Sequence, residues 1–478
     1  MADGVLTTPA RGVEPRTERS TLVDAVVSAA AVAAAIAILV IVAIDGPLEI
    51  AGDWLVVDRV AAAWTVFAAV IVVAIRAFAH RQLAADPARR HFRRASVFAA
   101  LSAVALFWAG NLVALALAAV VSSVAAAALV DGRGPRRPVA RRMRRVLGVG
   151  DLALVAAVCL VVSDRDGIAF AELAGTDGIV MHLASCLAVV AALARCGQVP
   201  AHGWLPRTLV APTPVSALLH AGLVNAGGVI AIRFGPLVAR STVATAVGIV
   251  AATVSMVVGV AIMRGRSEVK TALVWSTTAQ MGFMLVQVLV GLGGAAAAHL
   301  IAHGAYKSNL FLTSGSTLER PVRSTPVRTP GHRVVAGVLT AAVTWLAVWV
   351  AGYDVDAYGG AAWLLVAFVA LTVFALLDAP HGVARGLSLR AVVALVGLAA
   401  AATVYLELIS RFEHWLALPL PAPDGAVGWV VAVIVAVVVG AAVTGDHGTS
   451  LPASDLIRAR IIAAARRPAL DTVADDNP

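Results

Sequence analysis

The sequence has few charged residues and almost no lysine. Charged residues make up 14% of its 478 residues and hydrophobic ones 60%, whereas soluble domains have about 25% and roughly 45–50%. This composition excludes a soluble enzyme, a disordered chain and a nucleic-acid-binding module. Of 37 basic residues only two are lysines, Lys270 and Lys307. Because arginine stays protonated while a buried lysine titrates readily, these two residues are the first candidates for proton chemistry.

Cysteine and nucleotide-binding motifs are also scarce. The three cysteines, Cys159, Cys186 and Cys196, lie in or beside apolar segments without CxxC spacing, which argues against a disulfide scaffold and against a metal or redox site. The sequence contains neither GxGxxG nor a phosphate-binding loop ending in Lys-Ser/Thr. We therefore expect no cofactor, no bound metal and no ATP-driven pump.

Long apolar runs fill most of the sequence. Each has about the 20 residues that a helix needs to cross the hydrocarbon core. They cover residues 22–44, 60–79, 95–110, 111–130, 147–163, 178–198, 214–234, 242–263, 270–291, 294–315, 334–352, 360–378, 389–409 and 427–444. We predict an all-α fold: a polytopic membrane bundle of about 14 transmembrane helices, with broken helices near the midplane. The expected organisation is an N-terminal tail over 1–21, a transmembrane domain over 22–444 and a C-terminal tail over 445–478.

The loops between these runs alternate in charge. Arginines gather around residues 81–94, 133–145, 264–266, 320–333, 385–390 and 458–467, whereas acidic residues mark the loops at 45–58, 164–177 and 354–356. With 14 helices, every strongly basic loop falls on one side, as the positive-inside rule requires. We therefore expect a multi-pass protein of the cell inner membrane with both termini cytoplasmic. The net charge of +9 then reflects topology, and no nucleic-acid partner is expected.

Titratable residues inside the runs are few, and each is a functional candidate because charge is costly in a bilayer. The candidates we select are His182, Arg195, His220, Lys270, His299, His303 and Lys307. The spacing i, i+4, i+8 places His299, His303 and Lys307 on one helix face. Histidine titrates near neutral pH and a buried lysine can release its proton, so this face is suited to passing protons. In the alternative interpretation, these side chains form hydrogen bonds that only hold helices together.

Prolines interrupt the segment between the sixth and seventh runs. They are Pro200, Pro206, Pro212 and Pro214. Proline removes a backbone donor and kinks or breaks helices, and broken helices at membrane depth commonly mark ion pathways. A loop followed by a helix with Pro214 in its first turn is the simpler alternative. That alternative leaves unexplained the small and polar residues that follow, among them His220 and Asn225.

Three sequence blocks resemble the antiporter-like membrane subunits of respiratory complex I, the proton-conducting membrane transporter family. The blocks are Gln198-Val-Pro-Ala-His-Gly-Trp-Leu-Pro206 with Ala211-Pro-Thr-Pro-Val-Ser-Ala-Leu-Leu-His-Ala221, Glu268-Val-Lys-Thr-Ala-Leu-Val-Trp-Ser-Thr-Thr-Ala-Gln-Met-Gly282, and His299-Leu-Ile-Ala-His-Gly-Ala-Tyr-Lys-Ser-Asn-Leu-Phe-Leu312. The resemblance implies a 14-helix fold with a line of buried ionisable groups near the midplane. It places His220, Lys270, His299, His303 and Lys307 in that line, and Arg195 where the family has a lysine.

The sequence departs from this family pattern in three places. Val120 stands where the family has a glutamate, and the sequence offers no acid nearby. No lysine follows Lys307, although the family carries one on a late broken helix. At Arg195, a fixed charge replaces a titratable one.

Within the family, Val215-Ser-Ala-Leu-Leu-His-Ala-Gly-Leu-Val-Asn-Ala-Gly-Gly228 and Arg233-Phe-Gly-Pro236 resemble the DabB-type subunits of two-component inorganic-carbon accumulation systems. This resemblance implies a DabA-like peripheral zinc protein as partner. It also implies that a cation gradient, of protons or sodium, drives the conversion of carbon dioxide to bicarbonate there. The chain itself would be a transport subunit and not an enzyme.

Three functions remain open at this stage. In the first, Lys307, His303 and His299 carry protons for inorganic-carbon uptake, His220 is the connecting gate, and Arg195 adjusts the pKa values of these groups. In the second, the chain is a cation/proton antiporter or a subunit of a respiratory quinone oxidoreductase or hydrogenase. In the third, it is a membrane anchor that docks a soluble enzyme and moves no ion.

Overall fold

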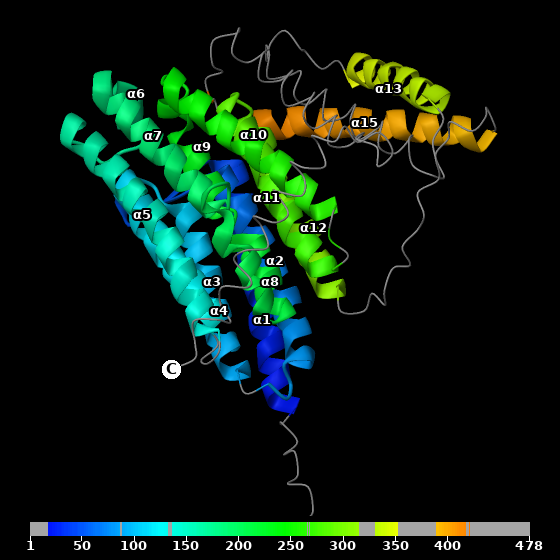
Figure 1. Cartoon of the computed structure of the whole chain (residues 1–478). Helices are drawn as coiled ribbons and strands as arrows, with labels where there is room; N and C mark the ends of the chain where they lie inside the picture. Colours follow the sequence, from blue (N-terminus) through cyan, green and yellow to red (C-terminus); the bar gives the residue numbers. More distant parts are fainter. Residues whose placement is uncertain are drawn as a thin grey trace, which may run out of the picture.

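The computed structural model describes residues 18–86, 88–131, 136–264, 266, 268–314, 330–351, 389–416 and 420, and it is almost wholly helical there (Figure 1). The long helices are α1 (Glu18–Asp45), α2 (Arg59–Gln82), α3 (Arg89–Trp108), α4 (Leu112–Asp131), α5 (Arg137–Arg165), α7 (Gly178–Arg195), α9 (Ala226–Val238), α10 (Thr242–Arg264), α11 (Val269–Leu289), α12 (Gly293–Thr313), α13 (Pro330–Ala351) and α15 (Leu389–Leu416). Shorter helical elements are α6 (Glu172–Gly175), η2 (Ala201–Trp204), η3 (Pro206–Val210), α8 (Thr213–Leu218) and η4 (Leu219–Leu223).

The helices follow the predicted apolar runs. Twelve of the 14 runs coincide with described helices, and eight helical stretches are long and apolar enough to cross a membrane. The chain is therefore an all-helical, multi-pass membrane protein. The runs at 360–378 and 427–444 and the tail at 445–478 lie outside the described residues. So does the tail at 1–21, except that α1 already begins at Glu18.

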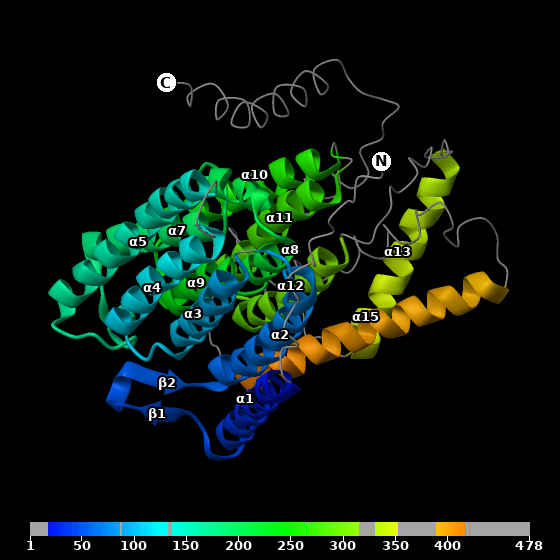
Figure 2. The ribbon, with the colours of Figure 1, turned by 90° about the horizontal axis from the view of Figure 1, so that it is seen from below.

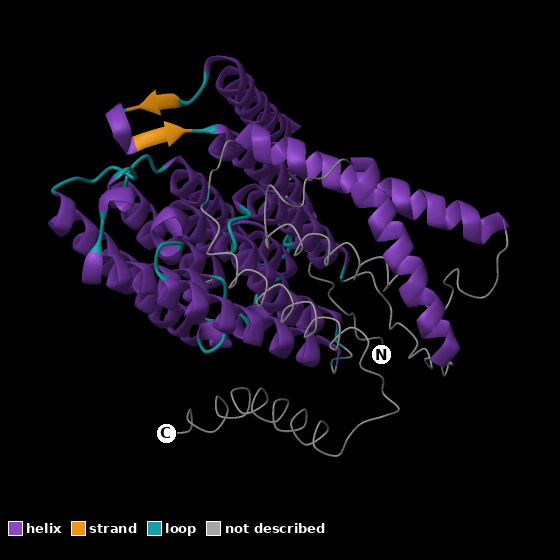
Figure 3. Ribbon diagram, turned by 90° about the horizontal axis from the view of Figure 1, so that it is seen from above, coloured by secondary structure: helices purple, strands orange, loops and turns teal. Residues whose placement is uncertain are grey.

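A small β-hairpin lies between α1 and α2, which the all-α prediction did not contain. Its strands β1 (Leu48–Ile50) and β2 (Leu55–Val57) pair antiparallel, with Glu49 opposite Val56. The turn between them contains Ala51 and Gly52 with positive φ, a conformation that lets the chain reverse within a few residues. Figures 2 and 3 show the hairpin at one end of the bundle, beside α1.

The hairpin defines one side of the molecule. Single β-bridges join Leu55 to Ala109 and Asn111 to Ala169, so the loops before α2, before α4 and after α5 meet there. Two of these loops are the acidic ones at 45–58 and 164–177. Helices α3 and α5 both begin at arginine-rich segments, and these lie at the opposite side of the bundle. The predicted segregation of loop charge is thus present in the part of the bundle that the structure describes.

The segment from Thr213 to Val238 is a broken helix. It starts as α8, widens into a π-helical turn at η4 and continues as α9. In the π-helical turn, the Val224 amide donates to the Leu219 carbonyl at 3.0 Å. The Asn225 side-chain amide donates to the Ala221 carbonyl at 2.9 Å and reaches the Leu300 carbonyl of α12 at 3.2 Å. The first bond satisfies a carbonyl of the widened turn, as buried irregular backbone requires, and the second ties the break to α12.

Helices α13 and α15 extend away from the other helices in Figures 1 and 3, yet the end of α15 returns to the bundle. There the Arg59 guanidinium at the start of α2 donates to the Trp415 carbonyl at 2.6 Å. The Glu413 carboxylate accepts a hydrogen bond from the Ala295 amide of α12 at 3.2 Å. The hairpin side of the bundle is therefore in contact with the last described helix.

Candidate functional site

The site centres on Lys307, a fully buried lysine in α12. Its ammonium donates to the Leu273 carbonyl at 3.0 Å and to the Ser276 hydroxyl, both on α11. Its side chain is completely inaccessible to solvent. Among the described residues it forms no salt bridge. A lysine held by neutral acceptors alone is the type of group that takes up and releases a proton readily.

His303 and His220 lie next to Lys307 in the buried interior. His220 comes from the π-helical turn η4 and stacks on Phe311 of α12, with ring centroids 4.6 Å apart. The Lys307 charge acts on both histidines, and His220 and His299 also act on His303. Neither ring nitrogen of His220 or His303 has a hydrogen-bond partner among the described residues. The structure therefore brings His220, His299, His303 and Lys307 together on and beside one face of α12.

His299 ends the group towards the hairpin side. Its Nδ1 is 2.9 Å from the Gln287 Oε1 of α11, and its ring centroid lies 6.2 Å from that of His303. Gln287 and Ser276 are 11 residues apart on α11 (287 − 276), a rise of about 16 Å at 1.5 Å per residue. We call His299, His303 and Lys307, with His220 beside them, the file. The file thus spans about half of a hydrocarbon core roughly 30 Å thick.

Gly304 allows α12 to approach the broken helix this closely. A β-carbon at Gly304 would lie 2.5 Å from the Phe67 ring and 2.8 Å from the Ala221 carbonyl, next to His220. Gly304 lies between His303 and Lys307 in α12. A larger residue at this position therefore pushes α12, with His303 and Lys307, away from the broken helix that carries His220.

We expect Gly304→Ala to lower transport activity and to destabilise the protein by about 1–3 kcal/mol through overpacking. The matched control is Gly148→Ala in α5, where an added β-carbon meets no atom within 4 Å. Thermal unfolding and transport by the two variants should be compared in the same membrane preparation. Equal behaviour of the two variants would show that the close approach at Gly304 has no role.

Arg195 forms a second, separate centre. It lies in the last turn of α7, which ends in a Schellman motif at Gly197: the Gln198 amide donates to the Leu193 carbonyl at 2.9 Å, and the Gly197 amide to the Ala194 carbonyl. The buried guanidinium pairs with Asp151 of α5 at 2.6 Å. It also donates to the Ala119 carbonyl and, at 2.7 Å, to the Ser123 hydroxyl of α4.

Asp151 was not among the predicted site residues, because no acid stands near Val120 in the sequence. The acid comes from the neighbouring helix: Asp151 lies at the middle of α5, 14 residues from either end (151 − 137 and 165 − 151). Val120 itself is 37% exposed, and the residues of α4 that meet Arg195 are Ala119, Ser122 and Ser123. Asp151 is the lone acid in the apolar run 147–163, and this is the sequence signal that marks it as a candidate.

The remaining predicted residues lie outside the file. Lys270 is half-buried at the start of α11, with its ammonium 3.4 Å from the Ala211 carbonyl. Pro200 and Pro206 lie in the loop that contains η2 and η3, while Pro212 and Pro214 begin α8. The helix break itself is at η4, beyond all four prolines. His182 is exposed and lies 2.9 Å from the Ser241 hydroxyl.

The proline-containing loop carries a basic surface at the end of the bundle opposite the hairpin. Burial lowers the pKa of His202, and the Arg207 guanidinium lowers it further. Burial also lowers the pKa of Arg207, and Arg142 at the start of α5 adds to this effect. His202 is therefore neutral at pH 7, and its ring packs against Trp275 with centroids 5.5 Å apart.

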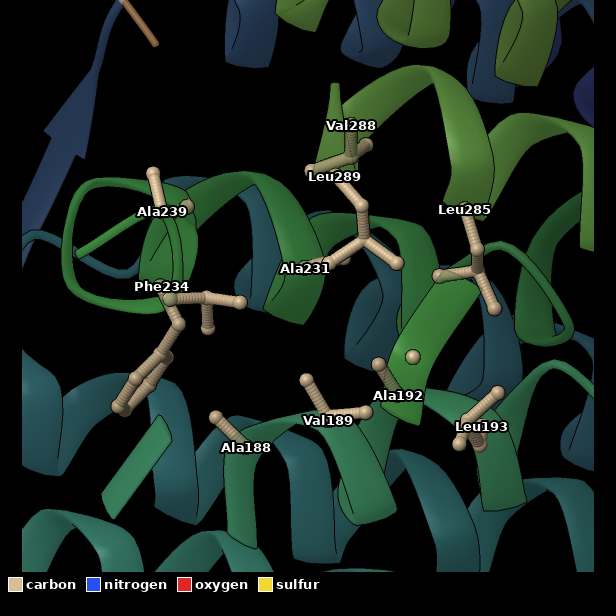
Figure 4. A pocket seen from close by; sticks show the side chains of 13 residues that line it. Ala188, Val189, Ala192, Leu193, Ala231, Phe234, Ala239, Leu285, Val288 and Leu289 are labelled. Carbon is tan, nitrogen blue, oxygen red and sulfur yellow. The ribbon is translucent and has the colours of Figure 1, made fainter. Parts of the chain in front are cut away.

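Among the described residues, no three His, Cys, Asp or Glu side chains are grouped to hold a metal ion. One pocket in that part of the chain is lined by apolar residues of α7, α9, α10 and α11. Figure 4 shows its lining, with Val189 and Ala192 of α7 facing Ala231 and Phe234 of α9, and Leu285 and Leu289 of α11 above. None of the residues that line it has a polar side chain.

Comparison with known families matches residues 109–352 to the transmembrane family described as "NADH:quinone oxidoreductase/Mrp antiporter, TM". The "Probable inorganic carbon transporter subunit DabB" of Hydrogenovibrio crunogenus is 37% identical over 252 residues, which are 52% of this chain and 46% of that protein. The protein of the same name in Bacillus subtilis is 43% identical over 165 residues, 34% of this chain and 32% of that protein. The "NADH-quinone oxidoreductase subunit L" of Mycobacterium tuberculosis is 33% identical over 177 residues, 36% of this chain and 28% of that protein.

The chain spans about half or less of the length of these curated relatives. Two solved structures share its fold. A chain of the Mrp complex from Dietzia sp. DQ12-45-1b gives a TM-score of 0.54 at 22% identity, covering 96% of this chain and 55% of that chain. A chain of the membrane-bound sulfane sulfur reductase, an archaeal respiratory membrane complex, gives 0.59 at 18% identity, covering 89% of both.

Proposed function

The chain belongs to the NADH:quinone oxidoreductase/Mrp antiporter transmembrane family, and from this premise we propose that it is the membrane subunit of a two-component inorganic-carbon uptake complex. It couples a cation gradient to the accumulation of carbon dioxide and bicarbonate by a zinc-containing, DabA-like peripheral partner. Relatives named as inorganic carbon transporter subunits, at 37% and 43% identity, support this assignment over other members of the family.

The observation that carries the proposal is the buried file. Its members His220, His303 and Lys307 are buried and His299 is partly buried, and among the described residues Lys307 has only a carbonyl and a hydroxyl as acceptors. Such groups are expensive in a bilayer and are kept where they serve transport. We assign the proton as the coupling ion, because sodium prefers oxygen ligands and the file consists of nitrogen bases.

In the proposed mechanism, protons move along α12 between His299, His303 and Lys307. His220 connects the file to the broken helix, where a change in the π-helical turn would move its ring relative to Lys307. Arg195 is bonded to Asp151, so we assign it a fixed structural charge. Lys270, half-buried at the other end of α11, is placed to exchange protons with the arginine-rich side.

The orientation in the membrane follows from the loop charges. We place the arginine-rich loops and both termini in the cytoplasm, by the positive-inside rule, and the β-hairpin on the outer side. The basic surface near Arg142 and Arg207 is then available to a cytoplasmic partner. Accessibility of single introduced cysteines at residues 52 and 141 to an impermeant thiol reagent tests this orientation.

The experiment that tests the function expresses the chain with its neighbouring genes in a host that lacks carbonic anhydrase. We expect growth in air and uptake of labelled inorganic carbon, both abolished by a protonophore. We also expect a large zinc-containing protein to co-purify with the chain. Uptake that persists in the presence of the protonophore would contradict the proposed coupling.

One observation favours a second function, that of a subunit in a multi-subunit cation/proton antiporter or respiratory complex. The chain of the archaeal respiratory complex matches this chain over 89% of both lengths. This alternative predicts co-purification with several antiporter-like subunits and sodium or quinone-dependent activity. Inorganic-carbon uptake by the chain and one partner alone would exclude it.

A further inference from the structure

Helices α3 and α5 carry the same arrangement of exposed side chains. Each has two arginines four residues apart and a leucine seven residues after the second arginine. The residues are Arg90, Arg94 and Leu101 in α3, and Arg141, Arg145 and Leu152 in α5. Intervals of four and seven residues keep the three side chains of each helix on one face. The arginines are exposed and the two leucines are 64% and 72% exposed, so this face points away from the bundle.

Helix α4 joins these two faces into one surface. It packs against both α3 and α5, as Figures 1 and 2 show, and α3 and α4 both contact η4 and α9 on their other side. At the arginine end, the His91 Nε2 of α3 lies 2.6 Å from the Ala128 carbonyl of α4. The exposed side chains of α4 are all apolar: Leu117, Val120, Val121 and Val124. We call these four residues, with the four arginines and two leucines of α3 and α5, the α3–α5 surface.

The α3–α5 surface is positive at one end and apolar beyond it. None of its four arginines forms a salt bridge with another residue that the structure describes. Seven residues of helix rise about 10 Å, so Leu101 and Leu152 lie about 10 Å further into the membrane than Arg94 and Arg145. The positive-inside rule accounts for arginines at this end of the bundle, but not for their place on the exposed face in line with the leucines.

An anionic phospholipid has the same order of charge and apolarity. Its phosphate lies at the membrane boundary and its acyl chains extend into the hydrocarbon. The arginine guanidinium binds phosphate oxygens through two parallel hydrogen bonds, and clusters of arginine at a membrane boundary attract anionic lipids. A soluble protein can reach the arginines, but the apolar part of the surface lies at membrane depth and out of its reach. Charge and depth together therefore favour a lipid.

We propose that the α3–α5 surface binds anionic phospholipid from the adjoining leaflet. Lipid phosphates accept hydrogen bonds from the two arginine pairs, and the acyl chains lie along the two leucines and the exposed apolar residues of α4. The site is separate from the file and goes beyond the proposed transport function, because it requires only that the chain spans a membrane. The chain then retains such lipids after extraction from the membrane in detergent.

The test measures lipid binding by the purified full-length chain, with any protein that co-purifies with it. The detergent micelles contain phosphatidylglycerol and phosphatidylcholine in equal amounts, and bound lipids are counted by native mass spectrometry. We expect the chain to bind phosphatidylglycerol in preference to phosphatidylcholine. Replacing one arginine of each pair, Arg94→Gln with Arg145→Gln, should weaken phosphatidylglycerol binding by at least about 10-fold, because each arginine near an anionic surface contributes a several-fold factor to the affinity. Both arginines are exposed, so the thermal unfolding midpoint should not change.

The matched control is Arg81→Gln with Arg207→Gln. It removes the same charge from the same end of the bundle, at the end of α2 and in η3, outside the α3–α5 surface. The control should bind phosphatidylglycerol as the unaltered chain does. Equal binding by the two variants, or no lipid preference in the unaltered chain, would overturn the proposal. Loss of a co-purifying protein from the Arg94→Gln, Arg145→Gln variant without loss of phosphatidylglycerol binding would also overturn it, because the surface would then be a protein interface. None of these results depends on proton transport, so the proposed function is tested separately.

Discussion

Replacing Lys307 by methionine is expected to reduce proton-coupled transport by at least about 100-fold while the complex still assembles. Removal of a positioned proton-transfer group typically costs a factor of about 10² to 10⁴ in rate. Methionine fills a similar volume and removes a buried charge that has no carboxylate partner among the described residues, so folding should be preserved. Uptake of labelled inorganic carbon and dye-reported proton flux measure the loss.

Two variants show what the lysine contributes. Lys307→Arg keeps a positive charge but cannot release its proton, so it should be as inactive as Lys307→Met. Tyr306→Phe alters the neighbouring residue on the exposed face of the same helix and should transport at the wild-type rate. Substantial transport by Lys307→Arg would mean that the charge alone matters, and the relay mechanism would then be wrong.

Replacing Asp151 by alanine is expected to destabilise the protein by about 3–5 kcal/mol, because it leaves the Arg195 guanidinium buried without its counter-ion. The two serines and the Ala119 carbonyl that also accept from Arg195 carry no charge and cannot replace the carboxylate. The measurement is the midpoint of thermal unfolding in detergent or nanodiscs, together with the amount of protein found in the membrane.

The double variant Arg195→Met with Asp151→Leu distinguishes a structural pair from a transport pair. Replacing a buried ion pair by apolar residues of similar volume is often neutral for stability, so the double variant should recover most of the loss. We also expect it to keep part of its transport, because Arg195 is outside the file. A stable but completely inactive double variant would instead make the pair part of the proton pathway.

Much of the fold and part of the site could be predicted from the sequence. Apolar runs of helical length predicted the positions of twelve described helices in the sequence. They could do so because a membrane span requires a continuous hydrophobic surface that is visible in a single sequence. The four-residue spacing of His299, His303 and Lys307 likewise identified one face of α12. Whether these residues carry protons stays a prediction until the variants are measured.

What escaped prediction depends on contacts between helices distant in sequence. The Arg195–Asp151 pair joins residues 44 positions apart, and Glu413 meets Ala295 across 118 positions. A single sequence carries no signal for such pairings. The helix break was expected near the prolines, but the widened turn at Leu219–Leu223 contains none, and its backbone is satisfied by the Asn225 amide. The hairpin was missed because three-residue strands are too short for a periodic pattern.

The ion pair between Arg195 and Asp151 has an electrical consequence for the file. Since these two charges cancel, Lys307 is the one fully buried charge without a counter-ion in the part of the chain that the structure describes. The file extends over about half the thickness of the hydrocarbon core. A proton that travels its length therefore crosses a corresponding part of the transmembrane field, worth about 1 kcal/mol per 100 mV, half the value for a full crossing. Transport through this protein should accordingly respond to membrane voltage even when the pH is equal on both sides.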